Sequence, residues 1–370
     1  MEKNLIVRGA PQEFECRVGA WDALGNHLER RGLKRVLVIH GGVSWDKARR
    51  FFPELPGVDA IFEQYNGECS FEERDRMAVL AKTANVDVII GVGGGKVADL
   101  AKAVAVYLAM PVVILPTLAA TCAAWTPLSV MYDTRGEMLQ YDIFARSNAL
   151  VLLDPAVILD SPIELMVAGI GDTLAKWYEA DVIISQLTER SVAIDMSHYT
   201  AKLCRDILLE SSVGALEAMR DGKLSEAFVK VVETNIMIGG MVGGFGDDYG
   251  RTSGAHSIHD ALTVLDATHH LLHGNKVAYG VFVQLMIENR PDEIATLRGF
   301  YEELGLPTCL LDMGLDGLSD EALKQVAERA TIADETIHLM PGEITATTVF
   351  DAMKDLEVLI AKLRAEVHAS

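Results

Sequence analysis

Short runs of apolar residues alternate with helical patterns along the chain up to Asp154. Four runs are apolar over almost their whole length: residues 35–40, 86–92, 112–116 and 150–154. Strands buried on both faces of a parallel sheet have this pattern. Helical spacing of apolar positions lies between most of them, as in residues 71–84 and 97–108. We therefore predict an α/β domain built on a doubly wound, Rossmann-like parallel sheet.

Strand patterns stop after Ser161, and amphipathic helical patterns follow to the end of the chain. They cover residues 172–185, 191–209, 225–242 and 276–289. A chain of 370 residues is long enough for two domains. We predict an α/β domain over residues 1–158 and an all-helical domain over residues 159–370.

The composition excludes several classes of protein. A formal net charge of −20 argues against sequence-independent nucleic-acid binding, which needs lysine and arginine against phosphates. The first residues lack the basic and apolar regions of a signal peptide, and no uninterrupted apolar run reaches membrane-spanning length. The five cysteines have no CxxC spacing, which indicates neither a disulfide framework nor a structural zinc site. We expect a cytoplasmic protein without nucleic-acid or membrane partners.

Histidine is concentrated between Gly254 and Gly280. This stretch holds five of the ten histidines, namely His256, His259, His269, His270 and His273. A single histidine is more often a surface or capping residue, but such a concentration in an apolar, helical stretch favours a metal site. The HExxH pattern of metalloproteases is excluded, because Ser257 and Asp260 stand where it needs Glu and His. Two imidazoles from different helices and a distant carboxylate would form an open, three-ligand site.

A glycine-rich turn follows the second apolar run. Gly93, Gly94, Gly95 and Lys96 lead directly from the predicted strand into a helix. Glycines let a phosphate approach the backbone, and the helix start offers free N–H groups. The turn matches neither the Walker A pattern nor GxGxxG, and a tight turn with a solvated lysine remains an alternative. Because ligands collect at strand ends in such sheets, we favour a dinucleotide.

Two further stretches extend this edge of the sheet. Thr117 and Thr126 belong to a group of small hydroxyl side chains that either bind a cofactor or cap an ordinary loop. Asp172 follows a glycine at an expected helix start, where it is either an N-cap or, given partners elsewhere, a metal ligand. Lys176 and Glu179 fall on or near one face of this helix, a spacing that solvated salt bridges also have.

Several motifs occur in a fixed order along both predicted domains. They are GGGKVADLAKA (93–103), PTLAAT (116–121), GIGDTLAKWYEA (169–180), AHSIH (255–259) and HHLLHGNKVAYG (269–280). Together they resemble the iron-containing alcohol dehydrogenase superfamily, and most closely its glycerol dehydrogenase branch. The resemblance implies a nucleotide-binding α/β domain, a helical metal-binding domain, and an active site in the cleft between them.

The resemblance also implies residue roles. The family's metal ligands fall on Asp172, His256 and His273, with His259 behind them or in the substrate pocket. Its nucleotide contacts fall on Gly95, Lys96, Thr117, Thr126, Leu128 and Tyr132, while Gly93, Gly94 and Asp99 shape the loop. The implied cofactors are NAD(P)(H) and one divalent metal, Zn²⁺ ahead of Fe²⁺ or Mn²⁺, which lowers the pKa of the substrate hydroxyl for hydride transfer.

One departure from the glycerol dehydrogenase pattern concerns the substrate. Cys122 stands where these enzymes carry an aspartate that binds the hydroxyls of the substrate, and a thiol cannot replace that carboxylate. The blocks TCAAWTPLSV and MVGGFGDDYGR instead resemble bacterial hydroxycarboxylate dehydrogenases, which interconvert 2-oxo and 2-hydroxy acids. We predict a small 2-oxo acid as substrate, with Arg251 binding its carboxylate. A helix-end pair of Arg251 with Asp247 or Asp248 is the alternative.

A second departure concerns the dinucleotide. NAD-preferring relatives place an acid just after the second strand, whereas this strand runs into His40, Gly41 and Gly42. Without an acid to repel a 2′-phosphate, NADP(H) is acceptable and slightly favoured. His40 is a candidate contact to that phosphate.

Other functions fit the same motifs less well. A glycerol or vicinal diol dehydrogenase is the main alternative. A cyclising lyase like dehydroquinate synthase would want several extra basic residues near the metal, where the histidine stretch offers Lys276 and little else. A non-catalytic sensor would need a degraded ligand set. Relatives are commonly oligomers, so we also expect a homo-oligomer, by analogy alone.

Overall fold

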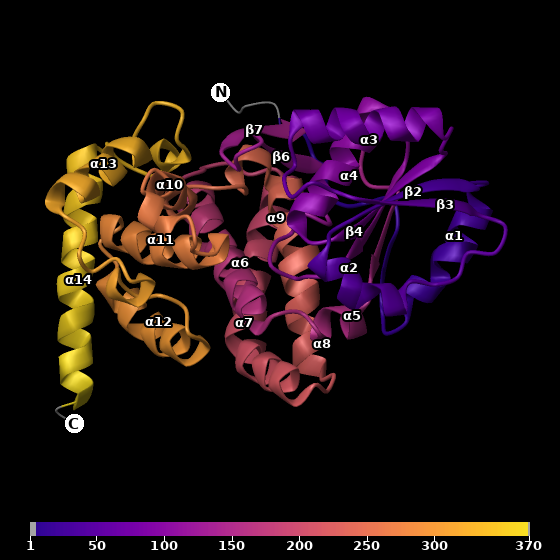
Figure 1. Cartoon of the computed structure of the whole chain (residues 1–370). Helices are drawn as coiled ribbons and strands as arrows, with labels where there is room; N and C mark the ends of the chain where they lie inside the picture. Colours follow the sequence, from indigo (N-terminus) through magenta and orange to yellow (C-terminus); the bar gives the residue numbers. More distant parts are fainter. Residues whose placement is uncertain (1–4, 369–370) are drawn as a thin grey trace.

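A parallel six-stranded sheet forms the amino-terminal part of the computed structural model, which describes residues 5–368 (Figure 1). Its order is β1-β8-β5-β4-β2-β3, and all neighbouring strands run parallel. The strands are β1 (Phe14–Cys16), β2 (Arg35–His40), β3 (Asp59–Gln64), β4 (Val88–Gly93), β5 (Val112–Pro116) and β8 (Leu150–Leu153). The four predicted apolar runs supply β2, β4, β5 and β8, and the predicted fold class is confirmed.

Alternate residues of the central strands enter two different hydrophobic cores. Leu37 and Ile39 of β2 pack in the core that includes α3 (Phe71–Thr83) and α4 (Gly95–Tyr107). Val36 and Val38 pack in the core that includes α1 (Leu24–Arg30) on the opposite face. Successive side chains of a strand point to opposite faces of the sheet, and helices cover both faces. These strands are therefore apolar at nearly every position.

Strands β1 and β3 and a separate hairpin were not predicted from the sequence. β1 and β3 are the two edges of the sheet, and β3 is only half-buried. The hairpin pairs β6 (Leu128–Tyr132) with β7 (Met138–Ile143) in antiparallel fashion, and β7 is mostly exposed. Edge and hairpin strands face water on one side, so they lack the continuous apolar run that marks a central strand.

The second part of the chain is helical. Within the described residues, no strand lies after Leu153. The helices beyond it are α5 (Pro155–Leu159), α6 (Ile163–Ile184), α7 (Val192–Asp221), α8 (Glu226–Glu233), α9 (Gly239–Gly246), α10 (Gly254–Leu262), α11 (His273–Ile287), α12 (Pro291–Leu304), α13 (Asp320–Ala330) and α14 (Ala346–His368). A short α2 (Val43–Ala48) belongs to the first part. The boundary between residues 158 and 159 falls inside α5 and stays a prediction.

One helical stretch, Glu226–Tyr249, is long and apolar enough to cross a membrane by length and composition alone. It comprises α8, a π-helical turn at Thr234–Ile238, α9 and a 3-10 turn at Asp247–Tyr249. Of its most apolar window, 61% is buried inside the fold. A core helix passes the same test, and burial within the helical part accounts for the apolar composition of this one.

Candidate active site

Three helices that carry potential ligands pack directly against one another. Asp172 lies on α6, His256 on α10 and His273 at the start of α11. Two glycines permit the close approach: a Cβ at Gly274 would lie 1.8 Å from the carbonyl oxygen of Ala168 in α6, and one at Gly280 would lie 2.3 Å from the carbonyl oxygen of Ala255 in α10. Any larger residue would therefore push the helices and their ligands apart. Figure 1 shows α6, α10 and α11 as neighbours.

The three predicted metal ligands converge. The Nε2 atoms of His256 and His273 lie 3.3 and 3.4 Å from Oδ1 of Asp172. One ligand atom from each residue falls within 4.8 Å of the others. Asp172 Oδ1 is buried and has no hydrogen-bond partner, which is costly for a carboxylate oxygen. A divalent cation would satisfy it, and a set of one oxygen and two imidazole nitrogens fits Zn²⁺, Fe²⁺ or Mn²⁺.

The charges around Asp172 favour its ionised form. Burial alone would raise the pKa of this carboxyl, but the ammonium of Lys176 and the two imidazoles outweigh burial and hold the pKa well below its usual range. Lys176 follows Asp172 by one helical turn and donates to the carbonyl oxygen of Arg251 at 3.3 Å. Asp172 is therefore present as a carboxylate, the form that binds metals.

Both candidate histidine ligands are oriented through their Nδ1 atoms. His256 Nδ1 lies 2.7 Å from Oε2 of Glu179. His273 Nδ1 lies 2.9 Å from Nε2 of His259, whose own Nδ1 lies 2.8 Å from Asp260. An acceptor at Nδ1 leaves the Nε2 lone pair free to bind a cation, and in both rings Nε2 is the atom that faces Asp172. His259 thus lies behind His273, one of the two places predicted for it.

The remaining histidines of the cluster lie elsewhere. His269 and His270 are exposed in the stretch between α10 and α11. His269 Nε2 lies 3.0 Å from the carbonyl oxygen of Thr263, so this ring closes a local turn. Of the five clustered histidines, His256, His259 and His273 are the ones that meet.

Two interpretations of α6 made from the sequence are wrong. The helix begins at Ile163, so Asp172 lies in its middle and is not an N-cap. Gly169 and Gly171 lie inside the helix, where they allow close packing. Lys176 and Glu179 are buried, so they do not form a solvated pair.

The glycine turn lies where a parallel sheet binds ligands. β4 ends at Gly93 and α4 begins at Gly95, with Gly94 at the N-cap position. From β2 the chain moves outward to β3 and then returns to β4 on the other side of β2, so the strand order reverses between β2 and β4. The crevice at the carboxyl ends of strands at such a reversal is the usual place for a nucleotide. His40, at the end of β2, pairs in register with Val92 of β4.

Other predicted nucleotide contacts surround this turn. Thr117 donates its amide to the carbonyl oxygen of Gly93 at 3.0 Å. Lys96 forms an ion pair of 2.6 Å with Glu68, and its Nζ lies 5.3 Å from the centre of the Tyr132 ring. Thr126 lies two residues before the hairpin, and Leu128 is the first residue of β6. Their contacts to a nucleotide stay predictions.

A buried lysine supports the loop beneath this site. Lys102 Nζ pairs with Asp99 at 2.8 Å and donates to the carbonyl oxygens of Ala123, Thr126 and Leu128, with distances of 2.7 and 3.1 Å to the first two. The other carboxylate oxygen of Asp99 accepts from the amide of Val130 at 3.0 Å. Asp99 was predicted to shape the loop; Lys102 was not recognised, although it lies one turn further along the same helix.

The predicted substrate residues lie close to Lys176. Burial raises the pKa of the Cys122 thiol, with Lys176 acting against burial and Asp172 adding to it, so Cys122 is neutral. Arg251 forms the alternative predicted for it, an ion pair of 2.8 Å with Asp247. Its Nε is buried and has no hydrogen-bond partner. A contact from Arg251 to a substrate stays a prediction.

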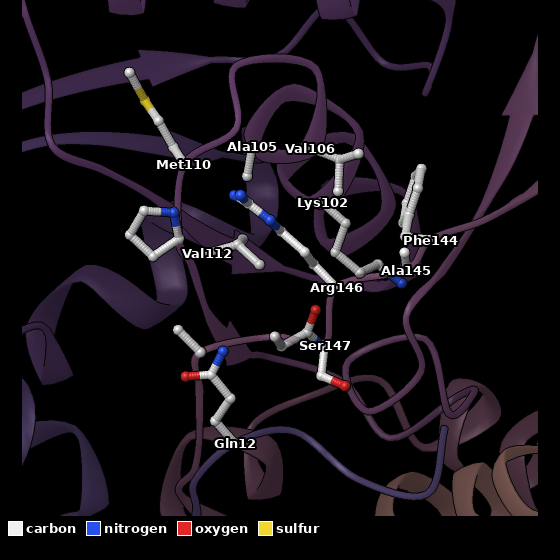
Figure 2. Close-up of a pocket in the computed structure, with 13 residues that line it drawn as sticks. Gln12, Lys102, Ala105, Val106, Met110, Val112, Phe144, Ala145, Arg146 and Ser147 are labelled. Carbon is white, nitrogen blue, oxygen red and sulfur yellow. The ribbon is translucent and has the colours of Figure 1, made fainter. Parts of the chain in front are cut away.

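A cavity of about 440 Å³ lies at another edge of the sheet, and Figure 2 shows the residues that line it. Its lining includes Gln12, Lys102, Val112, Arg146 and Ser147. Val112 is the first residue of β5, so the cavity lies at the amino ends of the strands. Nucleotides bind at the carboxyl ends in such sheets, and this cavity is therefore not the dinucleotide site.

Comparisons with known proteins cover most of the chain. The family model described as iron-containing alcohol dehydrogenase matches residues 11–155. Hydroxycarboxylate dehydrogenase A of Escherichia coli is 39% identical over 94% of this chain and 96% of its own length. Glycerol dehydrogenase of Thermotoga maritima is 39% identical over 93% of this chain and 94% of its own length. The crystal structure of glycerol dehydrogenase from Schizosaccharomyces pombe, 28% identical, matches with a TM-score of 0.89 and covers 100% of this chain and 94% of that one.

Proposed function

The chain belongs to the iron-containing alcohol dehydrogenase family, and from this premise we propose that it is a metal-dependent, NAD(P)-linked oxidoreductase that reduces small 2-oxo acids to 2-hydroxy acids. The observation that carries the proposal is the convergence of Asp172, His256 and His273 around a buried carboxylate oxygen without a partner. Interconversion of an alcohol and a carbonyl places negative charge on the substrate oxygen. A cation bound at this site would stabilise that charge.

In this proposal the helical part binds the metal and the α/β part binds the dinucleotide. A divalent ion held by the three ligands would supply a Lewis acid for the substrate oxygen. Gly95 and Lys96 offer the start of α4 and a positive charge to the pyrophosphate of the dinucleotide. Thr117 and the loop after it, which Lys102 supports, would supply further contacts to the dinucleotide.

The charges near Cys122 support an anionic substrate. A carboxylate at position 122 would repel a 2-oxo acid, whereas the neutral thiol does not. Lys176 is buried beside it and brings a positive charge into the same region. Arg251, with its buried and unpartnered Nε, is the proposed partner of the substrate carboxylate.

A glycerol or vicinal diol dehydrogenase is the second candidate. It is favoured by glycerol dehydrogenases among the similar proteins, one of them 39% identical. Cys122 separates the two candidates. With a thiol at this position, the site lacks the carboxylate that would accept hydrogen bonds from the hydroxyls of a diol.

For the dinucleotide we propose NADP(H) slightly ahead of NAD(H). β2 ends at His40, which is buried and stacked on Trp45 with ring centres 4.8 Å apart, and no acid follows in Gly41 or Gly42. An acid at this place would repel a 2′-phosphate and bind the ribose hydroxyls of NAD instead.

The test is a substrate profile of the purified protein with its metal retained. Oxidation of NADPH and NADH is followed at about 340 nm with 2-oxobutyrate, 2-oxoglutarate, dihydroxyacetone and a neutral aldehyde. We expect a higher kcat/KM for the oxo acids than for dihydroxyacetone, and for NADPH than for NADH. A preference for dihydroxyacetone would support the diol dehydrogenase instead, and a strong preference for NADH would contradict the cofactor proposal.

A further inference from the structure

Helix α10, which carries His256, begins without a cap of its own. Ser253 precedes the helix, but its side chain does not cap the helix. The Ser253 hydroxyl is buried and has no hydrogen-bond partner. The first N–H groups of a helix need acceptors, and at a buried helix end water cannot supply them. The acceptors must therefore come from other parts of the fold.

Two side chains from neighbouring helices supply these acceptors. Oε1 of Glu179 accepts from the amides of Ser253 and His256 at 2.7 and 2.9 Å. Oε1 of Gln284 accepts from the amide of Ala255 at 3.0 Å. Glu179 lies on α6 with Asp172, and Gln284 lies on α11 with His273. The helices that carry the other two ligands thus fix the start of the helix that carries His256.

The second carboxylate oxygen of Glu179 binds the imidazole of His256. Oε2 lies 2.7 Å from Nδ1, and the carboxylate is completely buried. A carboxylate accepts hydrogen bonds only, so the proton of the neutral ring must stand on Nδ1. The Nε2 lone pair then faces Asp172 Oδ1, 3.3 Å away. One side chain therefore sets the position of the helix, the rotation of the ring and the location of its proton.

Glu179 remains ionised in spite of its burial. Its two oxygens face three N–H groups, the amides of Ser253 and His256 and the Nδ1–H of the His256 ring, and hydrogen bonds of this kind favour the carboxylate form. Its position at the start of α10 adds the favourable end of the helix dipole. An acceptor-only group at this place is thus maintained by the fold.

We infer that Glu179 is a positioning residue for the divalent cation, acting through the Nδ1 atom of His256 and the first amides of α10. The inference rests on the proposed function, since it requires the cation site at Asp172, His256 and His273. It extends that function by making a buried carboxylate outside the ligand set a determinant of metal affinity.

The substitution Glu179→Gln tests the inference with little change in shape. Its amide has one acceptor oxygen against the three N–H groups that Glu179 accepts. If the oxygen stays on the two helix amides, the NH₂ group faces Nδ1, and the ring must move its proton to Nε2, where the cation binds. We expect the variant to bind Zn²⁺ roughly 10- to 100-fold more weakly than the unchanged protein.

Zn²⁺ affinity is measured on the metal-free protein by competition with a chelator. The visible spectrum of the Co²⁺-loaded protein gives a readout of the ligand set that is independent of activity. The matched control is Gln284→Leu, which removes the acceptor of Ala255 but leaves Glu179 and His256 in contact. This control should lower the melting temperature of the metal-free protein while keeping the Co²⁺ spectrum and most of the affinity.

The outcomes separate the inference from the proposed function. If the unchanged protein binds no Zn²⁺, the proposed function fails. If it binds Zn²⁺ and Glu179→Gln binds within about threefold of it with the same Co²⁺ spectrum, the inference is overturned. Should the variant not fold, ¹⁵N-histidine spectra of the unchanged Zn²⁺-loaded protein decide the matter. His256, assigned through His256→Ala, must be protonated at Nδ1, and protonation at Nε2 would overturn the inference.

Discussion

The Nε2 atom of His259 lies 2.9 Å from the Nδ1 atom of His273. Asp260 holds the opposite side of the His259 ring at 2.8 Å, so His259 donates from Nδ1 and accepts at Nε2. This arrangement leaves His273 with its proton on Nδ1 and its lone pair on Nε2, toward Asp172. The two candidate imidazole ligands are thus oriented by different devices: a buried carboxylate for His256 and a second imidazole for His273.

We predict that His259→Phe weakens Zn²⁺ binding by about tenfold, because His273 loses the acceptor that fixes its ring. His259→Gln keeps an oxygen acceptor and should retain most of the affinity. His269→Phe is the control, since that ring is exposed and lies 3.0 Å from the carbonyl oxygen of Thr263. Chelator competition measures all three variants. Equal affinities for His259→Phe and His269→Phe would contradict the role given to His259.

Lys102 supplies a second prediction, on stability. Its ammonium is buried and meets Asp99 and three backbone carbonyls, those of Ala123, Thr126 and Leu128. Lys102→Met leaves the carboxylate and the carbonyls without their donor, so we expect a loss of about 3–5 kcal/mol in the free energy of unfolding. Denaturant unfolding measures it. The change should also raise the KM for the dinucleotide, because the loop after β5 loses its support.

The control for Lys102 is Lys202→Met. Lys202 pairs with Asp206 on the surface of α7, and its side chain is 54% exposed. Such a pair contributes at most about 1 kcal/mol. Similar losses for the two lysine variants would mean that the network under the loop does not carry the stability assigned to it.

The sequence predicts the centre of the fold better than its edges. β2, β4, β5 and β8 are buried on both faces, so their apolar runs identify them. β1 has three residues and β7 is mostly exposed, so neither has an apolar run to detect. The start of α6 was misplaced for another reason. Gly169 and Gly171 suggest a helix start, but they lie inside the helix where other chain segments come close.

The site also contains residues that the sequence predicts and residues that only the structure reveals. Asp172, His256 and His273 could be predicted as candidate ligands because carboxylate and imidazole are recognisable ligand types and the motifs resemble a family, and the structure brings the three together. Glu179 and Asp260 were not assigned an orienting role, since it depends on which atoms the fold brings within hydrogen-bond distance. One signal was available for Glu179: it lies seven residues after Asp172, and two helical turns place both on one face of α6.

A pH-dependent contribution to stability is predicted at Asp312. Its carboxylate accepts from the amide and hydroxyl of Thr308 at 2.9 and 2.8 Å and pairs with Arg364 of α14 at 2.8 Å. Burial raises the pKa of Asp312, but these hydrogen bonds and the charge of Arg364 outweigh burial and lower it. A lowered pKa in the folded state means that the contribution is fully present above the unfolded value of about 3.9 and is lost as pH falls through the folded value.

Asp312→Asn should therefore lower the free energy of unfolding by about 1–3 kcal/mol near neutral pH, the range for hydrogen bonds to a charged group. The difference from the unchanged protein should shrink as pH falls below about 4. Urea unfolding of both proteins at a series of pH values measures it. A difference that stays constant across that range would mean that the ionised form of Asp312 contributes nothing specific.

Arg251 decides between the two proposed substrate classes. Its guanidinium pairs with Asp247 at 2.8 Å through one terminal nitrogen, while Nε is buried without a hydrogen-bond partner. A substrate carboxylate could bind through that free nitrogen, so Arg251→Leu should raise KM for 2-oxo acids by roughly 10- to 100-fold, the cost of a lost charge-assisted pair. KM for a neutral aldehyde should change little.

Asp247→Asn separates this role from a structural one. Removing the carboxylate of Asp247 releases the guanidinium, which should leave KM for 2-oxo acids unchanged or lower it, because the arginine keeps its charge and loses a competing partner. A purely structural Arg251 would give another pattern. Both substitutions would then lower the melting temperature by similar amounts and change KM equally for oxo acids and aldehydes, which would refute the substrate role of Arg251. Steady-state kinetics and thermal unfolding of the two variants, measured with the same substrates, distinguish these patterns.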